Sequence, residues 1–181
     1  MNSLTICSMF LGLILISQSP FAANATLLDL GGGGGVPLVS LLCDGSSNKV
    51  ECSKVLSSPQ TAQAKNWTEL SKAVAEIAIK KAVEGEAFLK GLAQKSKSQV
   101  LDTCANSYSS LVVTFKFCWD FADGDPHTVS YDCVTAGDLL ARCDGKVNPD
   151  VTAFNRQTKF LYGLLYETIT QLPNYLTGNQ G

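Results

Sequence analysis

The residues best suited to chemistry in this 181-residue chain are its seven cysteines and its single histidine. Cysteine side chains bind metals, attack substrates or pair as disulfides, and the redox compartment largely decides between these uses. Zinc sites favour Cys-x-x-Cys pairs together with histidines, but the sequence has no such pair and only His127. We therefore expect no metal site and no cofactor.

The other reactive side chains form no catalytic arrangement. His127 follows Asp125 at the start of an expected helix, where a solvated turn residue is the simplest interpretation. Glu84 and Glu86 lie on different faces of a helix, which is a poor arrangement for shared acid-base chemistry. We expect no catalytic residue and no enzyme activity.

The first 25 residues indicate the compartment. They contain no charged side chain. An apolar run over 4–16 is followed by small residues that end at Ala25. This pattern is typical of a secretory signal peptide, and the apolar run is shorter than the roughly 20 residues that span a bilayer. We expect cleavage after Ala25, secretion to the extracellular space and no membrane association once the signal is removed.

Removal of the signal deletes Cys7 and leaves six cysteines, an even number that favours disulfides in an oxidising compartment. Cys43 and Cys52 lie in a polar, turn-forming stretch. We interpret this pair as a staple that contributes about 3 kcal/mol in the chain-entropy account of disulfides. In the same compartment Asn66, which begins the sequon Asn-Trp-Thr, is our candidate for N-glycosylation.

The elements that position these residues are helical. From residue 66 almost to the end of the chain, apolar residues recur at three- and four-residue steps with polar residues between them. The turn and capping signals lie at Asn66, at Gly91 with the polar residues 94–98, at Asp123-Gly124, at Asp125-Pro126 and at Asn148-Pro149. Four such segments joined by short turns predict an all-α, up-and-down antiparallel four-helix bundle over 66–172.

Two further features complete the organisation. A Gly-rich linker over 26–37 follows the signal peptide over 1–25, and a separate stapled element precedes the bundle. The formal net charge of -2, with Lys and Arg dispersed along the chain, gives no electrostatic basis for binding nucleic acid or an anionic membrane.

Helix geometry leaves open two bridges between the second and third helices of the bundle. Cys104 with Cys143, and Cys118 with Cys133, would each lie about two residues, or about 3 Å, out of level in an antiparallel pair. Disulfides tolerate Cα separations up to about 7 Å, so this geometry permits both bridges together but does not require them. The alternative for Cys118 and Cys133 is a pair of buried thiols that act as small apolar residues.

The order and spacing of these residues resemble the plant invertase and pectin methylesterase inhibitor family over about residues 38–172. The resemblance rests on Cys43 with Cys52, Tyr108 four residues after Cys104, the Gly124-Asp125 turn, Cys143, and Asn155 after Pro149. It implies a bundle preceded by an N-terminal helical hairpin (38–65), together forming an inhibitor domain over 38–176. It also implies the disulfides Cys43–Cys52 and Cys104–Cys143, to which Cys118 and Cys133 are additions.

The resemblance also implies a function. Members of the family bind plant carbohydrate-active enzymes, either acid invertases or pectin methylesterases, and block the substrate cleft. We therefore expect a monomeric inhibitor in the apoplast, the cell wall or the vacuole, with a slight preference for invertase as its target.

The second hypothesis is a secreted bundle that binds a small apolar ligand between its helices. That function requires a cavity, whereas the apolar seams predict a filled core.

Overall fold

The structure is a computed structural model that describes residues 37–124, 126–144 and 148–172. The expected signal peptide over 1–25, with Cys7, and the expected linker up to residue 36 lie outside these residues. The side chains of 126–129 and 132 also lie outside them. The helices of the described residues are α1 (Leu38–Gly45), α2 (Lys49–Val55), α3 (Pro59–Ala62), α4 (Trp67–Ser96), α5 (Gln99–Asp120), α6 (Pro126–Ala141) and α7 (Pro149–Thr170).

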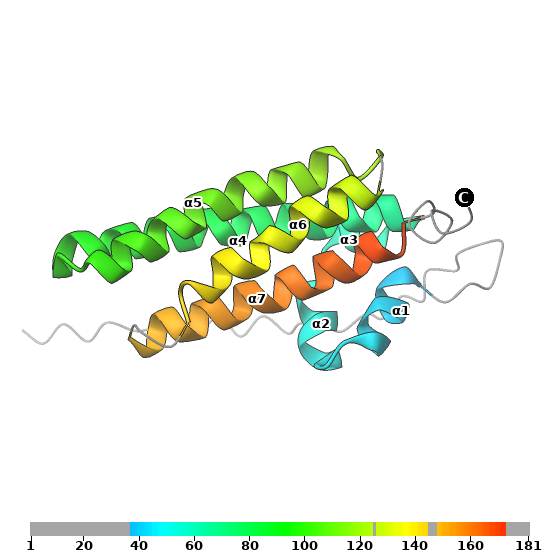
Figure 1. Ribbon diagram of the computed structural model, residues 1–181. Coiled ribbons are helices and arrows are strands. Elements are labelled where there is room, and N and C mark those ends of the chain that lie inside the picture. Colours follow the sequence, from blue (N-terminus) through cyan, green and yellow to red (C-terminus); the bar gives the residue numbers. More distant parts are fainter. Residues whose placement is uncertain (1–36, 125, 145–147, 173–181) are drawn as a thin grey trace, which may run out of the picture. The chain divides into compact units, whose positions relative to one another are not determined.

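The four long helices, α4 to α7, form an antiparallel up-and-down bundle (Figure 1). α4 packs against α5 and α7, and α6 packs against the same two helices. Helices that follow one another in the chain are therefore neighbours in space, as short connections require. The predicted all-α four-helix bundle is confirmed.

The N-terminal helices α1 and α2 pair with each other before the bundle begins. The Cys43–Cys52 disulfide joins them, with the two Cα atoms 5.5 Å apart. α1 also contacts α4 and α7, so this hairpin packs onto the bundle. The single turn α3 was not expected from the sequence. The Ser58 hydroxyl caps it by accepting the Thr61 N–H at 3.3 Å.

Asparagine side chains begin two of the long helices. The Asn66 side chain accepts a hydrogen bond from the Glu69 N–H at 2.8 Å, and Asn148 accepts one from the Val151 N–H at 3.0 Å. Each satisfies a backbone donor that the first turn of a helix otherwise leaves without a partner. The capping signals seen in the sequence at these two asparagines are therefore real helix starts.

α4 ends within the stretch that the sequence predicted, Gly91 with the polar residues 94–98. The helix continues to Ser96, because Leu89 and Ala93 remain buried on either side of the glycine and keep the chain packed against the bundle. α4 ends at Lys97, whose φ of 50° lies in the left-handed region that terminates helices. The polar residues after Gly91, and not the glycine itself, mark the boundary.

Apolar side chains fill the bundle core. The apolar residues that recur at three- and four-residue steps along the second long helix form a seam and are all buried, namely Leu101, Cys104, Tyr108, Leu111, Phe115, Cys118 and Ala122. Within the described residues, no buried side-chain nitrogen or oxygen lacks a hydrogen-bond partner. None of these helices is long and apolar enough to cross a membrane.

A polar network crosses this core. The Tyr108 hydroxyl of α5 donates to Asn155 Oδ1 of α7 at 3.0 Å and lies 3.1 Å from Thr158 Oγ1. Asn155 Nδ2 in turn donates to the Leu140 carbonyl at 3.0 Å and to Asp144 Oδ1 at 2.9 Å. Burial raises the pKa of Tyr108 to about 12, and the nearby Asp144 carboxylate adds to the rise.

The Tyr108 ring fits against the bundle because residue 85 of α4 is a glycine. A Cβ atom at Gly85 would lie 2.3 Å from Tyr108 Cε1 and 2.6 Å from Phe154 Cε1, which is closer than van der Waals contact allows. Gly91, on the same helix, has no atom within 4 Å of the corresponding point. The close approach of the Tyr108 and Phe154 rings to α4 therefore requires glycine at position 85, whereas position 91 has room for a side chain.

Two disulfides connect α5 with the α6 region. Cys104 is bonded to Cys143, with Cα atoms 5.2 Å apart, and Cys118 is bonded to Cys133, with Cα atoms 6.0 Å apart. Both separations lie within the usual range for disulfides. The structure thus contains a bridge at Cys118 and Cys133 and not two buried thiols.

Our first prediction compares the two glycines of α4. Gly85→Ala should lower the free energy of unfolding by about 1–3 kcal/mol, because the new methyl group overpacks two rings. Gly91→Ala should raise it by about 0.5–1 kcal/mol, since alanine favours the helix and meets no neighbour. Urea unfolding of the oxidised proteins measures both. Equal effects at the two sites would contradict the packing described here.

The second prediction concerns alkaline pH. The pKa of Tyr108 is higher in the folded than in the unfolded state. The stability that its neutral hydroxyl contributes is therefore complete below pH 10 and is lost as pH rises toward 12. Relative to Tyr108→Phe, the wild-type free energy of unfolding should fall by about 1.4 kcal/mol between pH 9 and 11. Parallel stability curves for the two proteins over this range would show that Tyr108 ionises normally.

Candidate functional site

The side chains considered for chemistry do not converge. In the described part of the chain, no three His, Cys, Asp or Glu side chains are placed to hold a metal ion. The His127 side chain lies outside that part, so its expected role remains a prediction. Glu84 is exposed, whereas Glu86 accepts hydrogen bonds from Lys90 at 2.5 Å and from Ser109 Oγ at 2.6 Å. The Lys90 hydrogen bond is the main cause that lowers the pKa of Glu86.

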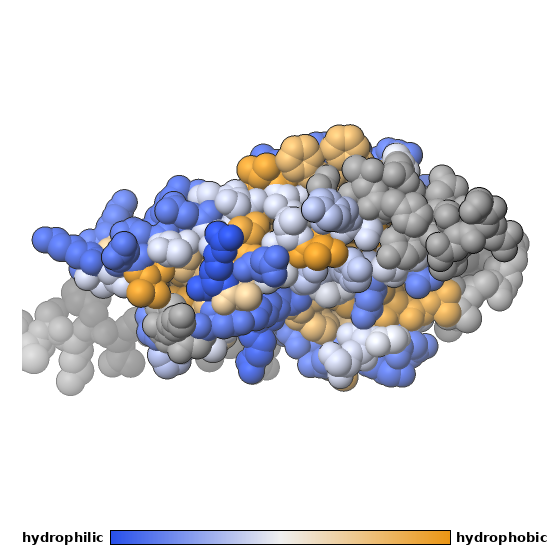
Figure 2. Space-filling view, viewed as in Figure 1, coloured by the Kyte–Doolittle hydropathy of each residue, from blue (hydrophilic) through white to orange (hydrophobic). Residues whose placement is uncertain are grey.

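An exposed apolar surface lies on the hairpin of α5 and α6. We use the name hairpin patch for the large exposed apolar side chains of this hairpin, which are Val113 and Phe117 of α5, Phe121 at the C-terminal cap of α5, and Tyr131 and Val134 of α6. The first three recur at four-residue steps and so share one face of their helix. Figure 2 shows apolar atoms on this upper edge of the molecule, over the C-terminal half of α5. Tyr131, with 78% of its surface accessible, is the most exposed aromatic residue of the patch.

Covalent and aromatic contacts hold the patch in shape. Four of its members lie within three residues of Cys118 or Cys133, so the disulfide fixes the helix segments that carry them. The rings of Phe117 and Phe121 stack with centroids 5.9 Å apart and an angle of 17° between their planes. The side chains are therefore arranged before any partner arrives.

Polar contacts also attach the end of α5 to α4. Lys72 of α4 forms a salt bridge with Asp123, and its ammonium lies 5.2 Å from the centre of the Trp119 ring. Trp119 Nε1 donates to Glu76 Oε1 at 3.3 Å. Trp119 thus faces α4, while Phe117 and Phe121 remain on the exposed side.

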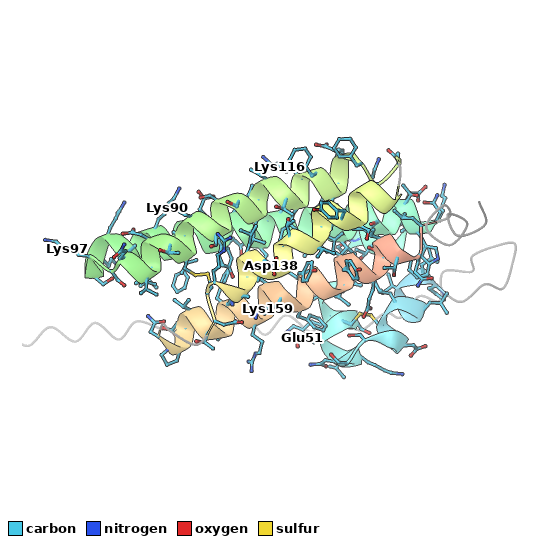
Figure 3. All side chains as sticks on the ribbon, in the orientation of Figure 1. Glu51, Lys90, Lys97, Lys116, Asp138 and Lys159 are labelled. Atoms are coloured by element: carbon cyan, nitrogen blue, oxygen red, sulfur yellow. A yellow bond between two sulfur atoms is a disulfide. The ribbon has the colours of Figure 1, made fainter. Side chains whose placement is uncertain are left out.

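Two opposite charges are interleaved with the aromatic residues of the patch. Lys116 and Asp120 are both exposed and lie four residues apart on the same face of α5. Figure 3 shows Lys116 on α5 at the outer edge of the bundle. Neither side chain forms a hydrogen bond or salt bridge with another residue that the structure describes.

A surface of this composition is suited to binding another protein. Exposed apolar patches on soluble proteins mark interaction sites more often than chance, and aromatic residues dominate the energetics of such contacts. A preordered patch loses little conformational entropy when it binds. The hairpin patch can therefore act as a docking surface without any chemistry of its own.

A separate, concave feature lies between α2, α4 and α7. It is an open groove of about 640 Å³, whose apolar lining residues include Val50, Val55, Ile77, Phe160 and Leu161. Three lysines and two glutamates also line it, namely Lys54, Lys80, Lys81, Glu51 and Glu84. One of these lysines is engaged, because Lys81 Nζ lies 3.8 Å from the Phe154 ring centre and donates to Gln157 Oε1 at 2.9 Å.

The hairpin patch was not predicted from the sequence. The structure places Phe115 in the core, leaves 45% of the Phe117 surface exposed and half-buries Trp119 against α4. The overlooked signal was the four-residue repeat of Val113, Phe117 and Phe121 on the face opposite the buried seam. A second apolar face on a bundle helix is typical of a contact surface.

The remaining candidate residues lie away from this patch. Asn66 is exposed at the start of α4, where its Oδ1 caps the helix and its Nδ2 donates to Glu69 Oε1 at 3.2 Å. The Cys43–Cys52 bridge belongs to the α1–α2 hairpin, and the Cys104–Cys143 bridge ties the start of α5 to the turn after α6. These bridges fix the scaffold and do not form a site together.

Comparison with known proteins identifies the architecture. No family model and no curated protein matches the sequence. A mutant form of a pectin methylesterase inhibitor from Arabidopsis matches with a TM-score of 0.65 at 18% identity, covering 76% of this chain and 99% of that one. Another pectin methylesterase inhibitor, from Arabidopsis thaliana, matches with a TM-score of 0.54 at 18% identity, covering 75% and 96%. The chain therefore has the fold of the pectin methylesterase inhibitors, and the resemblance predicted from its sequence is confirmed at the level of fold.

Proposed function

We propose that this protein is an inhibitor that docks on a plant carbohydrate-active enzyme, either an acid invertase or a pectin methylesterase, and blocks the substrate cleft. The hairpin patch is the observation that carries the proposal. It offers three exposed aromatic side chains, Phe117, Phe121 and Tyr131, on a hairpin stapled by a disulfide. The fold shared with pectin methylesterase inhibitors supports the same conclusion.

Docking by this patch requires no catalytic group. The aromatic side chains would supply contact area at the centre of the interface, while Lys116 and Asp120 would orient the partner. The stacked rings and the Cys118–Cys133 bridge keep the surface in one arrangement, so more of the contact energy is retained as affinity. The sequence slightly favoured acid invertase, whereas the matching structures make pectin methylesterase the first target to assay.

We also propose that the mature inhibitor begins after Ala25 and acts outside the cell or in the vacuole. The signal-like first 25 residues and the three disulfides support this location, because both belong to the secretory route. The inhibitor domain would then comprise the stapled hairpin over 38–65 and the bundle over 66–172. Asn66, exposed at the start of α4, is accessible for an attached glycan.

A second candidate function is the binding of a small apolar ligand. The bundle core is filled, so the groove between α2, α4 and α7 is the feature that favours this function. Its volume of about 640 Å³ lies in the usual range for small-molecule sites. Stoichiometric binding of an apolar fluorescent dye that Phe160→Asp abolishes, in a protein that inhibits neither enzyme, would favour this candidate over the inhibitor.

The third prediction tests the inhibitor directly. The oxidised mature protein should inhibit purified pectin methylesterase or acid invertase with a one-to-one endpoint. Replacing Phe117 and Phe121 together by alanine should weaken inhibition at least tenfold, because each buried aromatic anchor typically contributes more than about 1 kcal/mol. Enzyme assays titrated to stoichiometry between acidic and neutral pH measure both effects.

Val100→Ala provides the matched control. Val100 is exposed to the same extent as Phe117, 45%, and lies on the same helix about 26 Å away along its axis. This variant should inhibit like the wild type. Equal inhibition by the wild type and the double alanine variant would show that the docking surface lies elsewhere on the protein. A wild-type protein that inhibits neither enzyme would refute the proposed function.

The fourth prediction concerns Asn66. Protein purified from plant cells should lose the mass of one N-glycan on treatment with a glycosidase that cleaves at asparagine. Asn66→Asp should lack the glycan yet keep the stability of wild-type protein that is made without a glycan in bacteria and oxidised, because aspartate caps a helix as well as asparagine does. Mass spectrometry and thermal unfolding measure the two properties. An unchanged mass in the wild type would rule out the modification.

A further inference from the structure

We propose that the hairpin patch also binds a second copy of this chain, giving a two-fold dimer that hides the docking face of the free protein. The regulatory consequence, although not the dimer itself, rests on the proposed inhibitor function. The order of charges and rings along α5 points to a second copy as the partner.

The exposed face of α5 carries a stripe with a regular order. Val113, Lys116, Phe117, Asp120 and Phe121 follow one another at steps of three and one residues, so they occupy a single face of the helix. The lysine precedes one phenylalanine and the aspartate precedes the other. The stripe therefore alternates charge and ring, with the sign of the charge reversed between its two halves.

Such a stripe is complementary to itself in reverse. A two-fold axis between the levels of residues 118 and 119 places α5 of the two copies antiparallel. At a 1.5 Å rise, Lys116 is then within about 1.5 Å of level with Asp120 of the second copy. Phe117 is within the same distance of the level of the other Phe121. Each contact occurs twice, as an isologous interface requires.

The charges have no competing partner in the described residues. Lys116 and Asp120 form no hydrogen bond or salt bridge there, so pairing across the dimer breaks no existing one. The formal net charge of -2 leaves little general repulsion between two copies. The stacked Phe117 and Phe121 rings present apolar surface between the charged pairs.

The dimer would regulate inhibition by mass action. An interface centred on the few exposed side chains of this stripe is small and weak, so the protein dissociates on dilution and the monomer expected from the sequence is the form present at low concentration. A target enzyme then competes with the second copy for the same aromatic residues. Storage at high concentration would keep the docking surface covered.

Charge reversal tests the dimer without any enzyme. Sedimentation velocity of the full oxidised protein over a concentration series should show a monomer–dimer equilibrium. Lys116→Glu and Asp120→Lys should each lower the dimerisation constant at least tenfold, because each puts like charges opposite one another. An equimolar mixture of the two variants should restore dimerisation, since every charge of one stripe then faces its opposite in the other.

Lys95→Glu is the matched control, because it makes the same charge change at an exposed position in the last turn of α4. It should dimerise like the wild type. A wild-type protein that stays monomeric at millimolar concentration would overturn the proposal, as would a mixture of the two variants that fails to associate. Dimers without enzyme inhibition would refute the proposed function alone, and inhibition without dimers would refute this inference alone.

Discussion

The hydrogen bond between Tyr108 and Asn155 is the interaction on which the arrangement of the bundle depends. Both side chains are buried, so each must find polar partners inside the core, where an unsatisfied hydroxyl or amide destabilises the fold by about 1–3 kcal/mol. Asn155 satisfies this requirement only where α7 lies beside Tyr108 and the Leu140 carbonyl at once. The contact therefore sets the register of three helices, and Gly85 allows the fourth to close over the tyrosine ring. Apolar packing alone tolerates sliding, whereas this network accepts one register.

A core that is filled and fixed in this way leaves recognition to the surface. The three disulfides add to the effect, because one staples the α1–α2 hairpin and two tie α5 to the α6 region. The hairpin patch lies beside one of these bridges, and the groove lies where α2 meets the bundle. The hairpin patch is built from exposed side chains, whereas the groove is lined partly by Leu161 of the core and partly by exposed residues of α2 and α4. The same scaffold can therefore carry different partners when only its exposed residues change.

Sequence reasoning succeeded where one local signal dominates. The seam from Leu101 to Ala122 was predictable because a single buried face imposes a helical period, and the starts at Asn66 and Asn148 were predictable because side-chain capping is a local interaction. It failed where two residues of the same type have different surroundings. Phe115 and Phe117 differ only in the direction they face, and Gly85 and Gly91 only in what packs against them. The groove was unpredictable for a related reason, since it depends on where α2 rests and not on its composition.

The bridge between Cys118 and Cys133 lies entirely inside the loop that Cys104 and Cys143 close. This nesting favours one order of disulfide formation, in which the inner bridge forms before the outer one. The inner pair spans 15 residues and the outer pair 39, so the inner pair meets with about 0.9 kcal/mol less loop entropy to overcome. Once formed, it holds the outer thiols near each other at high effective concentration. A newly made chain can thus reach the correct pairing from the turn outward, with fewer errors for a disulfide isomerase to repair.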